Sequence, residues 1–72
     1  MKDFVMTNKL KLARVEKGMT QEELADLVGV TRQTIGLIEA GKYNPTLKLC
    51  LLLANTTGKS LDELFGIEGE IE

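Results

Sequence analysis

Three consecutive side chains, Arg32, Gln33 and Thr34, can form directed hydrogen bonds, and they follow a residue suited to capping a helix, Thr31. The guanidinium and the carboxamide can each make two parallel hydrogen bonds to a planar partner, and threonine offers a hydroxyl and a methyl group. In the first turn of a helix that begins after Thr31, we expect these three side chains to project outward. The pattern favours recognition of a polar partner.

Other residues that could carry chemistry are few. The sequence has no histidine and one cysteine, Cys50, which excludes an internal disulfide and argues against a zinc site. Cys50 lies in the apolar run 49–53, which favours a small buried side chain over a redox switch. Asp62 and Glu63 follow a helix cap, where carboxylates suit the helix dipole. With no catalytic triad or glycine-rich phosphate loop, the sequence predicts a protein that is not an enzyme and has no cofactor or metal.

Charge is unevenly distributed along the chain, whose net charge is −2. Residues 1–60 carry nine basic and six acidic side chains, a balance of +3, whereas residues 61–72 carry five acidic side chains and no basic one. The longer part can present a positive face to phosphates while the acidic end stays away from them. A solvated acidic tail that serves solubility is the alternative, and both interpretations can hold together.

Helix caps and glycines divide the chain into short helices. Thr20 and Ser60 each open a capping box, and Thr31 and Thr46 are single caps. The expected helices span residues 8–17, 20–28, 31–40, 46–55 and 60–65. Apolar residues at helical spacing predict a core of Leu10, Ala13, Leu24, Ala25, Val28, Val30, Ile35, Ile38, Leu49, Leu52, Leu53, Leu61 and Leu64. The expected fold class is all-α.

The two ends of the chain differ from the helices. Phe65, Ile67 and Ile71 alternate with glycine and glutamate, and Phe4–Met6 is a short apolar run. These patterns predict a small two-stranded β-ribbon between the ends, with a frayed tail as an alternative that the sequence leaves open. Because the chain shows no signal peptide and no apolar run near about 18 residues, we expect a cytoplasmic protein with no membrane partner.

Helix, glycine turn and helix occupy residues 21–39. Ala25 is small enough for two helices to approach closely, and Gly29 tolerates the positive φ that the turn needs. Val30 and Ile35 are placed to fill the angle between the helices. This arrangement turns the first residues of the second helix outward.

Residues 8–65 resemble the phage-repressor and Cro type of helix-turn-helix regulator, also called the xenobiotic-response-element (XRE) family. The matching stretches are Glu16–Ala25, Val28–Ile35, Ile38–Leu47 and Ser60–Phe65, in order and at the expected spacing. The resemblance implies a five-helix, repressor-like DNA-binding domain. We expect a single domain over residues 1–72, with a helix-turn-helix core at 8–65 and terminal extensions at 1–7 and 66–72.

The resemblance implies contacts to DNA bases from Arg32, Gln33 and Thr34, with Leu37 one turn later. Arginine can donate two hydrogen bonds to guanine, glutamine can pair with adenine, and threonine can touch a thymine methyl or a phosphate. Leu37 can offer only apolar contact, and an incidental exposed residue is the alternative.

Phosphate contacts are implied for Gln21 and for the loop residues Lys42, Tyr43 and Asn44. The cap Thr31 can reach a phosphate as well. For Tyr43, packing within its own loop is an equal alternative.

Two further positions bear on the helix packing. The resemblance implies an ion pair between Arg14 and Glu39 that holds the first and third helices together. Gly36 is unusual inside a helix, where glycine costs about 1 kcal/mol relative to alanine. The sequence does not decide whether Gly36 lets the groove wall approach or is merely tolerated.

A twofold dimer would place two recognition helices about 34 Å apart, one turn of DNA. The apolar residues available for a dimer face are Leu12, Val15, Leu27, Leu51, Phe65 and Ile67. The resemblance places this face at the fourth and fifth helices. We therefore expect a homodimeric transcriptional repressor that binds double-stranded DNA at a palindromic operator. A protein-interaction module, such as an antitoxin or anti-repressor, is the alternative, and the polar Arg32–Thr34 turn favours DNA.

Overall fold

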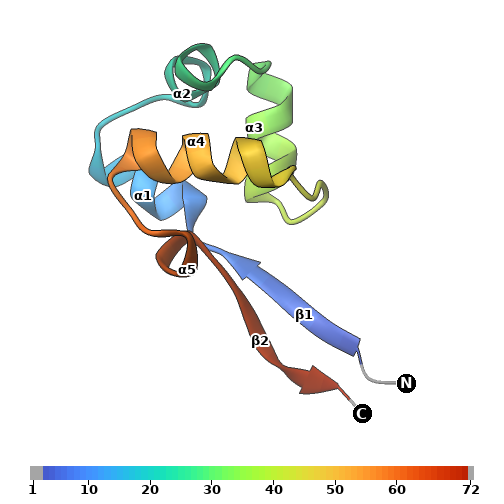
Figure 1. The fold of residues 1–72 in the computed structure, drawn as a ribbon. Coiled ribbons are helices and arrows are strands. Elements are labelled where there is room, and N and C mark those ends of the chain that lie inside the picture. Colours follow the sequence, from blue (N-terminus) through green and yellow to red (C-terminus); the bar gives the residue numbers. More distant parts are fainter. Residues whose placement is uncertain (1–2, 72) are drawn as a thin grey trace.

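Five helices form the body of the molecule, and two strands extend from it as a ribbon (Figure 1). The computed structural model describes residues 3–71, with side chains over residues 7–66. The elements in chain order are β1 (Asp3–Asn8), α1 (Leu10–Glu16), α2 (Gln21–Val28), α3 (Arg32–Glu39), α4 (Leu47–Thr57), α5 (Leu61–Leu64) and β2 (Phe65–Ile71). The ribbon gives the molecule an elongated shape of 39 × 21 × 19 Å.

Side-chain caps begin four of the helices. The Thr20 hydroxyl accepts a hydrogen bond from the Glu23 backbone N–H at 3.0 Å, and the Glu23 carboxylate accepts one from the Thr20 backbone N–H at 2.8 Å. Ser60 and Glu63 form the same reciprocal box at the start of α5. Thr31 and Thr46 cap α3 and α4. These local bonds explain why the predicted starts of α2 to α5 are correct.

Helix ends depart from the predictions by one or two residues. α4 continues to Thr57, two residues beyond the expected end, and stops at Gly58, whose left-handed backbone closes the helix. Thr57 is buried, and its hydroxyl donates to the Leu53 carbonyl one turn earlier at 2.8 Å. α5 ends at Leu64, because Phe65 adopts the extended backbone of β2. α1 begins at Leu10, since Asn8 is the last residue of β1.

The turn between α2 and α3 has the expected geometry. Gly29 has a φ of 78°, in the left-handed region, and the Val30 N–H donates to the Ala25 carbonyl at 3.0 Å. Ala25 and Ile35 are buried where the two helices meet. The turn therefore ends α2 and lets α3 pack against it.

The core lies among the five helices and is aliphatic. Its members are Leu10, Ala13, Leu24, Ala25, Val28, Ile35, Ile38, Leu49, Leu53, Ala54 and Leu64. The prediction was wrong for Leu52, which is 38% exposed, and it missed Ala54. The buried stripe of α4 follows residues 49, 53 and 57 and widens toward 54, so Leu52 falls on the solvent side. Val30 and Leu61 pack at the edge of the core.

The chain ends pair as an antiparallel ribbon, so the predicted ribbon is confirmed and the alternative of a frayed tail is wrong. Asn8 pairs with Phe65 at the root, and Asp3 pairs with Ile71 at the far end. A shift in register between Phe4 and Met6 introduces a bulge. The fold is therefore a five-helix domain with a small two-stranded sheet.

Candidate nucleic-acid interface

The first turn of α3 presents polar side chains on the surface, because the other face of the helix is buried. Ile35 and Ile38 are fully enclosed, whereas Arg32 and Gln33 are exposed and Thr34 is half-buried. Leu37, one turn later, is 37% exposed. The three polar residues and Leu37 that the sequence singled out thus lie on one accessible side of one helix.

A chain of hydrogen bonds links this surface to α1. Arg32 donates to the Gln21 amide oxygen at 3.3 Å, and the Gln21 amide nitrogen donates to Glu39 at 3.0 Å. Glu39 also accepts from Arg14, whose Nε lies 2.7 Å from Glu39 Oε2. The four side chains come from α1, α2 and both ends of α3. Through these bonds, the exposed Arg32 is connected to the buried pair of Arg14 and Glu39.

The Arg14–Glu39 ion pair is shielded from solvent. Its side chains are 11% and 5% exposed, and a second bond joins Arg14 Nη2 to Glu39 Oε1 at 3.3 Å. The remaining terminal nitrogen of Arg14 donates to the Met19 carbonyl at 2.8 Å. Because both charges are satisfied in this way, the pair can persist in a buried setting.

Gln21 has a bond pattern that the sequence did not predict. Its single side-chain oxygen accepts from Arg32, and one of its two amide hydrogens is used by Glu39. The second amide hydrogen can serve another acceptor at the same time. An ideal Cβ on Gly36 would lie 3.8 Å from this amide nitrogen, which is an ordinary contact distance.

Thr31 and the loop after α3 flank the polar turn. The Thr31 hydroxyl oxygen caps the Thr34 N–H at 3.2 Å and lies 3.0 Å from the Thr34 hydroxyl. Lys42, Tyr43 and Asn44 are exposed in the loop beyond the opposite end of α3. The structure therefore places the expected phosphate-contacting residues at both ends of α3 and at the start of α2.

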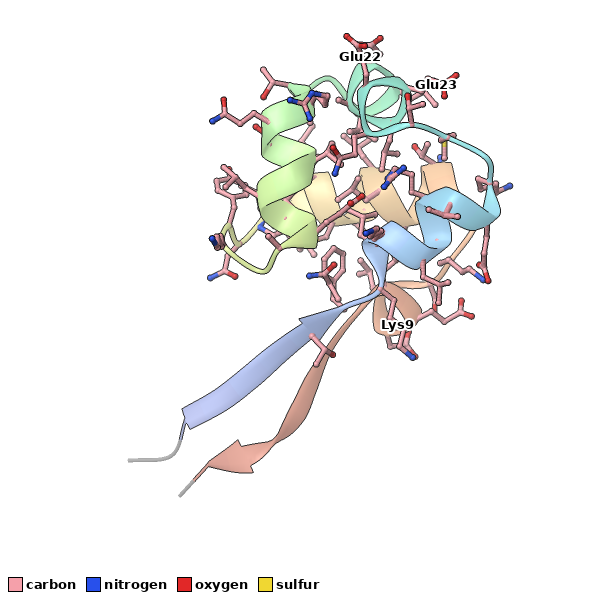
Figure 2. The ribbon with its side chains drawn as sticks, turned by 180° about the vertical axis from the view of Figure 1, so that it is seen from behind. Lys9, Glu22 and Glu23 are labelled. Carbon is pink, nitrogen blue, oxygen red and sulfur yellow. The ribbon has the colours of Figure 1, made fainter. Side chains whose placement is uncertain are left out.

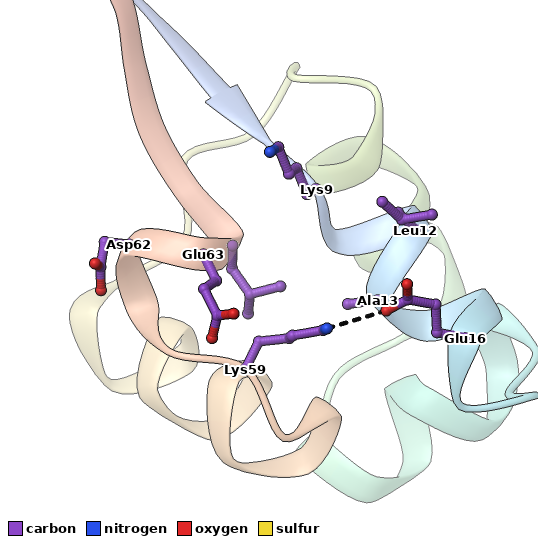
Figure 3. Close-up of a pocket in the computed structure, with 8 residues that line it drawn as sticks. Lys9, Leu12, Ala13, Glu16, Lys59, Asp62 and Glu63 are labelled. Carbon is purple, nitrogen blue, oxygen red and sulfur yellow. Dashed lines mark ion pairs between the residues drawn. The ribbon is translucent and has the colours of Figure 1, made fainter.

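Other charged groups lie on α2 and between α1 and α5. Glu22 and Glu23 project from α2 at the end of the molecule far from Lys9 and the ribbon (Figure 2). Between α1 and α5 lies a pocket of about 390 Å³, crossed by an ion pair of 3.1 Å between Lys59 and Glu16 (Figure 3). None of the expected DNA-contacting residues lines this pocket.

Cys50 is half-buried in α4, and burial raises the pKa of its thiol. This environment disfavours the reactive thiolate. Among the described residues, no group of three or more histidine, cysteine, aspartate or glutamate side chains is arranged to hold a metal ion. In the same part of the chain, no helix has the length and apolar character needed to cross a membrane.

Residues 10–64 match the family described as Helix-turn-helix. The chain belongs to this family of XRE/Cro-type transcriptional regulators. It is 46% identical to an uncharacterised helix-turn-helix-type transcriptional regulator of Methanocaldococcus jannaschii, over 90% of this chain and 98% of that protein. A counterpart in Bacillus subtilis is 42% identical over 90% of this chain and 98% of its own length.

Solved structures agree with this assignment. The restriction-modification controller protein C.AhdI from Aeromonas hydrophila is 37% identical and superposes with a TM-score of 0.70, over 75% of this chain and 82% of that one. This helix-turn-helix protein is therefore a DNA-binding transcriptional regulator of a non-enzymatic family.

Proposed function

We propose that this helix-turn-helix regulator is a repressor that binds a palindromic operator as a homodimer, with the first turn of α3 reading the bases. The observation that carries the proposal is the arrangement of α3. Its apolar face is buried through Ile35 and Ile38, while the side chains of Arg32 and Gln33 are exposed on the outer face. A helix of this kind fits the major groove with its N-terminal residues against the base edges.

The proposed base contacts follow from side-chain chemistry. Arg32 donates to guanine, and Gln33 pairs with adenine, each contact discriminating by roughly 1–3 kcal/mol. Thr34 and Leu37 offer methyl groups to thymine. Thr34 is held more tightly than its neighbours, because its backbone and hydroxyl both contact Thr31.

The proposed phosphate contacts surround the reading turn. Gln21 can hold Glu39 with one amide hydrogen and a phosphate oxygen with the other. Thr31 stands at the N-terminus of α3, where the helix dipole favours an anion. Lys42, Tyr43 and Asn44 supply donors from the loop at the other end of the helix.

The proposed dimer contact lies on the side of α4 and α5 that continues into the ribbon. Leu51 is 52% exposed on α4, and Phe65 lies at the ribbon root. Ile67, the other expected residue on this side, has a side chain outside the described residues. An isolated two-stranded ribbon is marginally stable in water, and its open edges can pair with further strands. Both properties support a partner at this site.

The remaining apolar candidates stand elsewhere on the surface. Leu12 and Val15 are each 57% exposed on α1, and Leu27 is 65% exposed on α2. We place them outside the dimer contact. We also propose that residues 1–72 act as one domain built around the core 8–65, and that the protein works in the cytoplasm, where its DNA partner lies.

The experiment is selection of bound duplexes from a random DNA pool, followed by titration of the selected duplex with salt. We expect an enriched inverted repeat, strong preference over random DNA, and affinity that falls steeply as salt rises. Failure to bind any duplex at low salt would overturn the proposal and indicate a protein partner instead. Selection of a single, unrepeated half-site would retain the base-reading role and overturn the dimer.

A further inference from the structure

Asn8 stands where the ribbon, α1 and the recognition helix meet. Its amide nitrogen donates to the Ile38 carbonyl of α3 at 2.9 Å. Its amide oxygen accepts from the Leu10 N–H, at the start of α1, at 3.3 Å. As the last residue of β1, it also pairs with Phe65 of β2. Its side chain therefore joins α1 to α3, and its backbone pairs with β2.

The bond to Ile38 secures the C-terminal turn of α3. The Ile38 carbonyl accepts from the Gly41 N–H at 2.9 Å and uses its other lone pair for Asn8. The next residue, Glu39, is bound by Arg14 from the other end of α1. Asn8 and Arg14 thus form hydrogen bonds to adjacent residues of the recognition helix. Of the two, only Asn8 belongs to the ribbon.

The root of the ribbon is itself firmly placed. The Lys9 N–H donates to the Leu64 carbonyl at 2.7 Å, which ties the root to the end of α5. A cavity of only about 40 Å³ separates Thr7 and Phe65 from the loop that carries Tyr43 and Asn44. The ribbon root therefore lies close both to the end of α3 and to the loop that follows it.

We infer that Asn8 is a positioning residue that couples the ribbon to the recognition helix and sets the half-site spacing that the protein accepts. The inference rests on the proposed dimer. If two copies meet through α4, α5 and their ribbons, the angle between each ribbon and its α3 contributes to where the two reading turns lie. The Asn8–Ile38 bond holds that angle, whereas the bonds of Arg14 and Gln21 to Glu39 hold only the local shape of the reading surface.

Two substitutions remove the bond to Ile38 and keep the bond to Leu10. Asn8→Asp retains an oxygen that accepts from the Leu10 N–H, but it presents a second oxygen, not a donor, to the Ile38 carbonyl. Asn8→Ser keeps a short acceptor for Leu10 and cannot reach Ile38. Lys9→Gln is the control, because it changes the net charge by the same amount as Asn8→Asp at a neighbouring exposed side chain.

The measurement is affinity for the selected palindrome, for the same palindrome with one base pair added or removed at its centre, and for a single half-site. For both Asn8 variants we expect the preference for the native spacing to fall about threefold to tenfold, the range for loss of one hydrogen bond. Half-site affinity and circular dichroism stay as in the wild type, and Lys9→Gln keeps the native preference.

Two outcomes overturn the inference alone. In one, both Asn8 variants discriminate spacing as well as the wild type does. In the other, half-site affinity falls in parallel with palindrome affinity, which assigns Asn8 to the stability of α3 and not to spacing. A wild-type protein that shows no spacing preference would instead overturn the proposed dimer, so the two failures are distinguishable.

Discussion

The α2–α3 unit and the terminal ribbon are stabilised by different means. Side chains from α1, α2 and α3 interlock behind the reading surface, with Arg14 and Glu39 almost fully removed from solvent. Beyond its root, the structure describes the ribbon by the backbone pairing of its two strands, which extend away from the helical body (Figure 1). The difference is in keeping with the proposed function, in which one copy of the chain preorganises the DNA-reading surface and a partner copy completes the ribbon.

The largest effect that would test this contrast is expected from Arg14→Ala. Removing the arginine leaves Glu39 as an uncompensated buried charge, so the unfolding free energy should fall by about 3–5 kcal/mol. Denaturant unfolding followed by circular dichroism measures the change. Lys11→Ala, an exposed position on the same helix, is the control and should stay within about 0.5 kcal/mol of the wild type. An unchanged unfolding midpoint for Arg14→Ala would mean that the interlocked side chains do not contribute to stability.

Arg32→Ala should leave stability unchanged and alter specificity. Loss of the guanidinium should cost roughly 1–3 kcal/mol and relax the preference at one base position in each half-site. Repeating the DNA selection with the variant measures both effects. Lys48→Ala removes one positive charge from an exposed site outside the proposed contacts. If Lys48→Ala relaxed the same base position, the reading role of Arg32 would be wrong.

The cap of α2 should contribute stability that depends on pH. The backbone N–H and the hydroxyl of Thr20 hold the pKa of the Glu23 carboxyl below its ordinary value of 4.5. Because the folded pKa is the lower one, this contribution is present above pH 4.5 and is lost as the pH falls through the folded value. As the pH falls below 4.5, the melting temperature should therefore fall less for Glu23→Gln than for the wild type. The matched variant Glu22→Gln should follow the wild-type curve; equal slopes for all three proteins would contradict the assignment.

Gly36→Ala should give the smallest change, a gain in stability, and its effect on binding decides what Gly36 does. Gly36 lies inside α3 with ordinary helical φ, and an added methyl meets nothing closer than Gln21 at 3.8 Å. We expect a gain of up to about 1 kcal/mol in unfolding free energy. Unchanged operator affinity would show that glycine is merely tolerated, and a loss of affinity would show that the groove wall approaches this point. A lower melting temperature would contradict the geometry.

Sequence reasoning succeeded where short-range chemistry decides the structure. Capping residues such as Thr20 and Thr31 bind backbone groups three positions away, so the starts of α2 to α5 could be predicted from the chain itself. The ribbon could be predicted only as one of two alternatives, the other being a frayed tail, because its pairs join residues near opposite ends of the chain. Leu52 was misplaced because α4 is apolar nearly all round, and helical spacing then does not select the buried face.

The candidate site was predictable in outline and not in its connections. The exposed turn Arg32–Thr34 follows from the cap and the buried Ile35, whereas the Arg14–Glu39 pair was expected only from the family resemblance. The bonds of Gln21 to Glu39 and of Asn8 to Ile38 depend on where helices cross, and no local pattern encodes them. For this reason the exposed turn could be predicted from the sequence, whereas the bonds that Gln21 and Asn8 make to α3 could not.

Backbone amide chemical shifts, recorded while the selected duplex is titrated into the protein, test the central claim most directly. We predict that the largest changes fall on the first turn of α3, on Gln21 and on the loop at Lys42–Asn44. Residues lining the pocket between α1 and α5, such as Glu16 and Lys59, should change little. Changes concentrated on that pocket, with the first turn of α3 unaffected, would contradict the account.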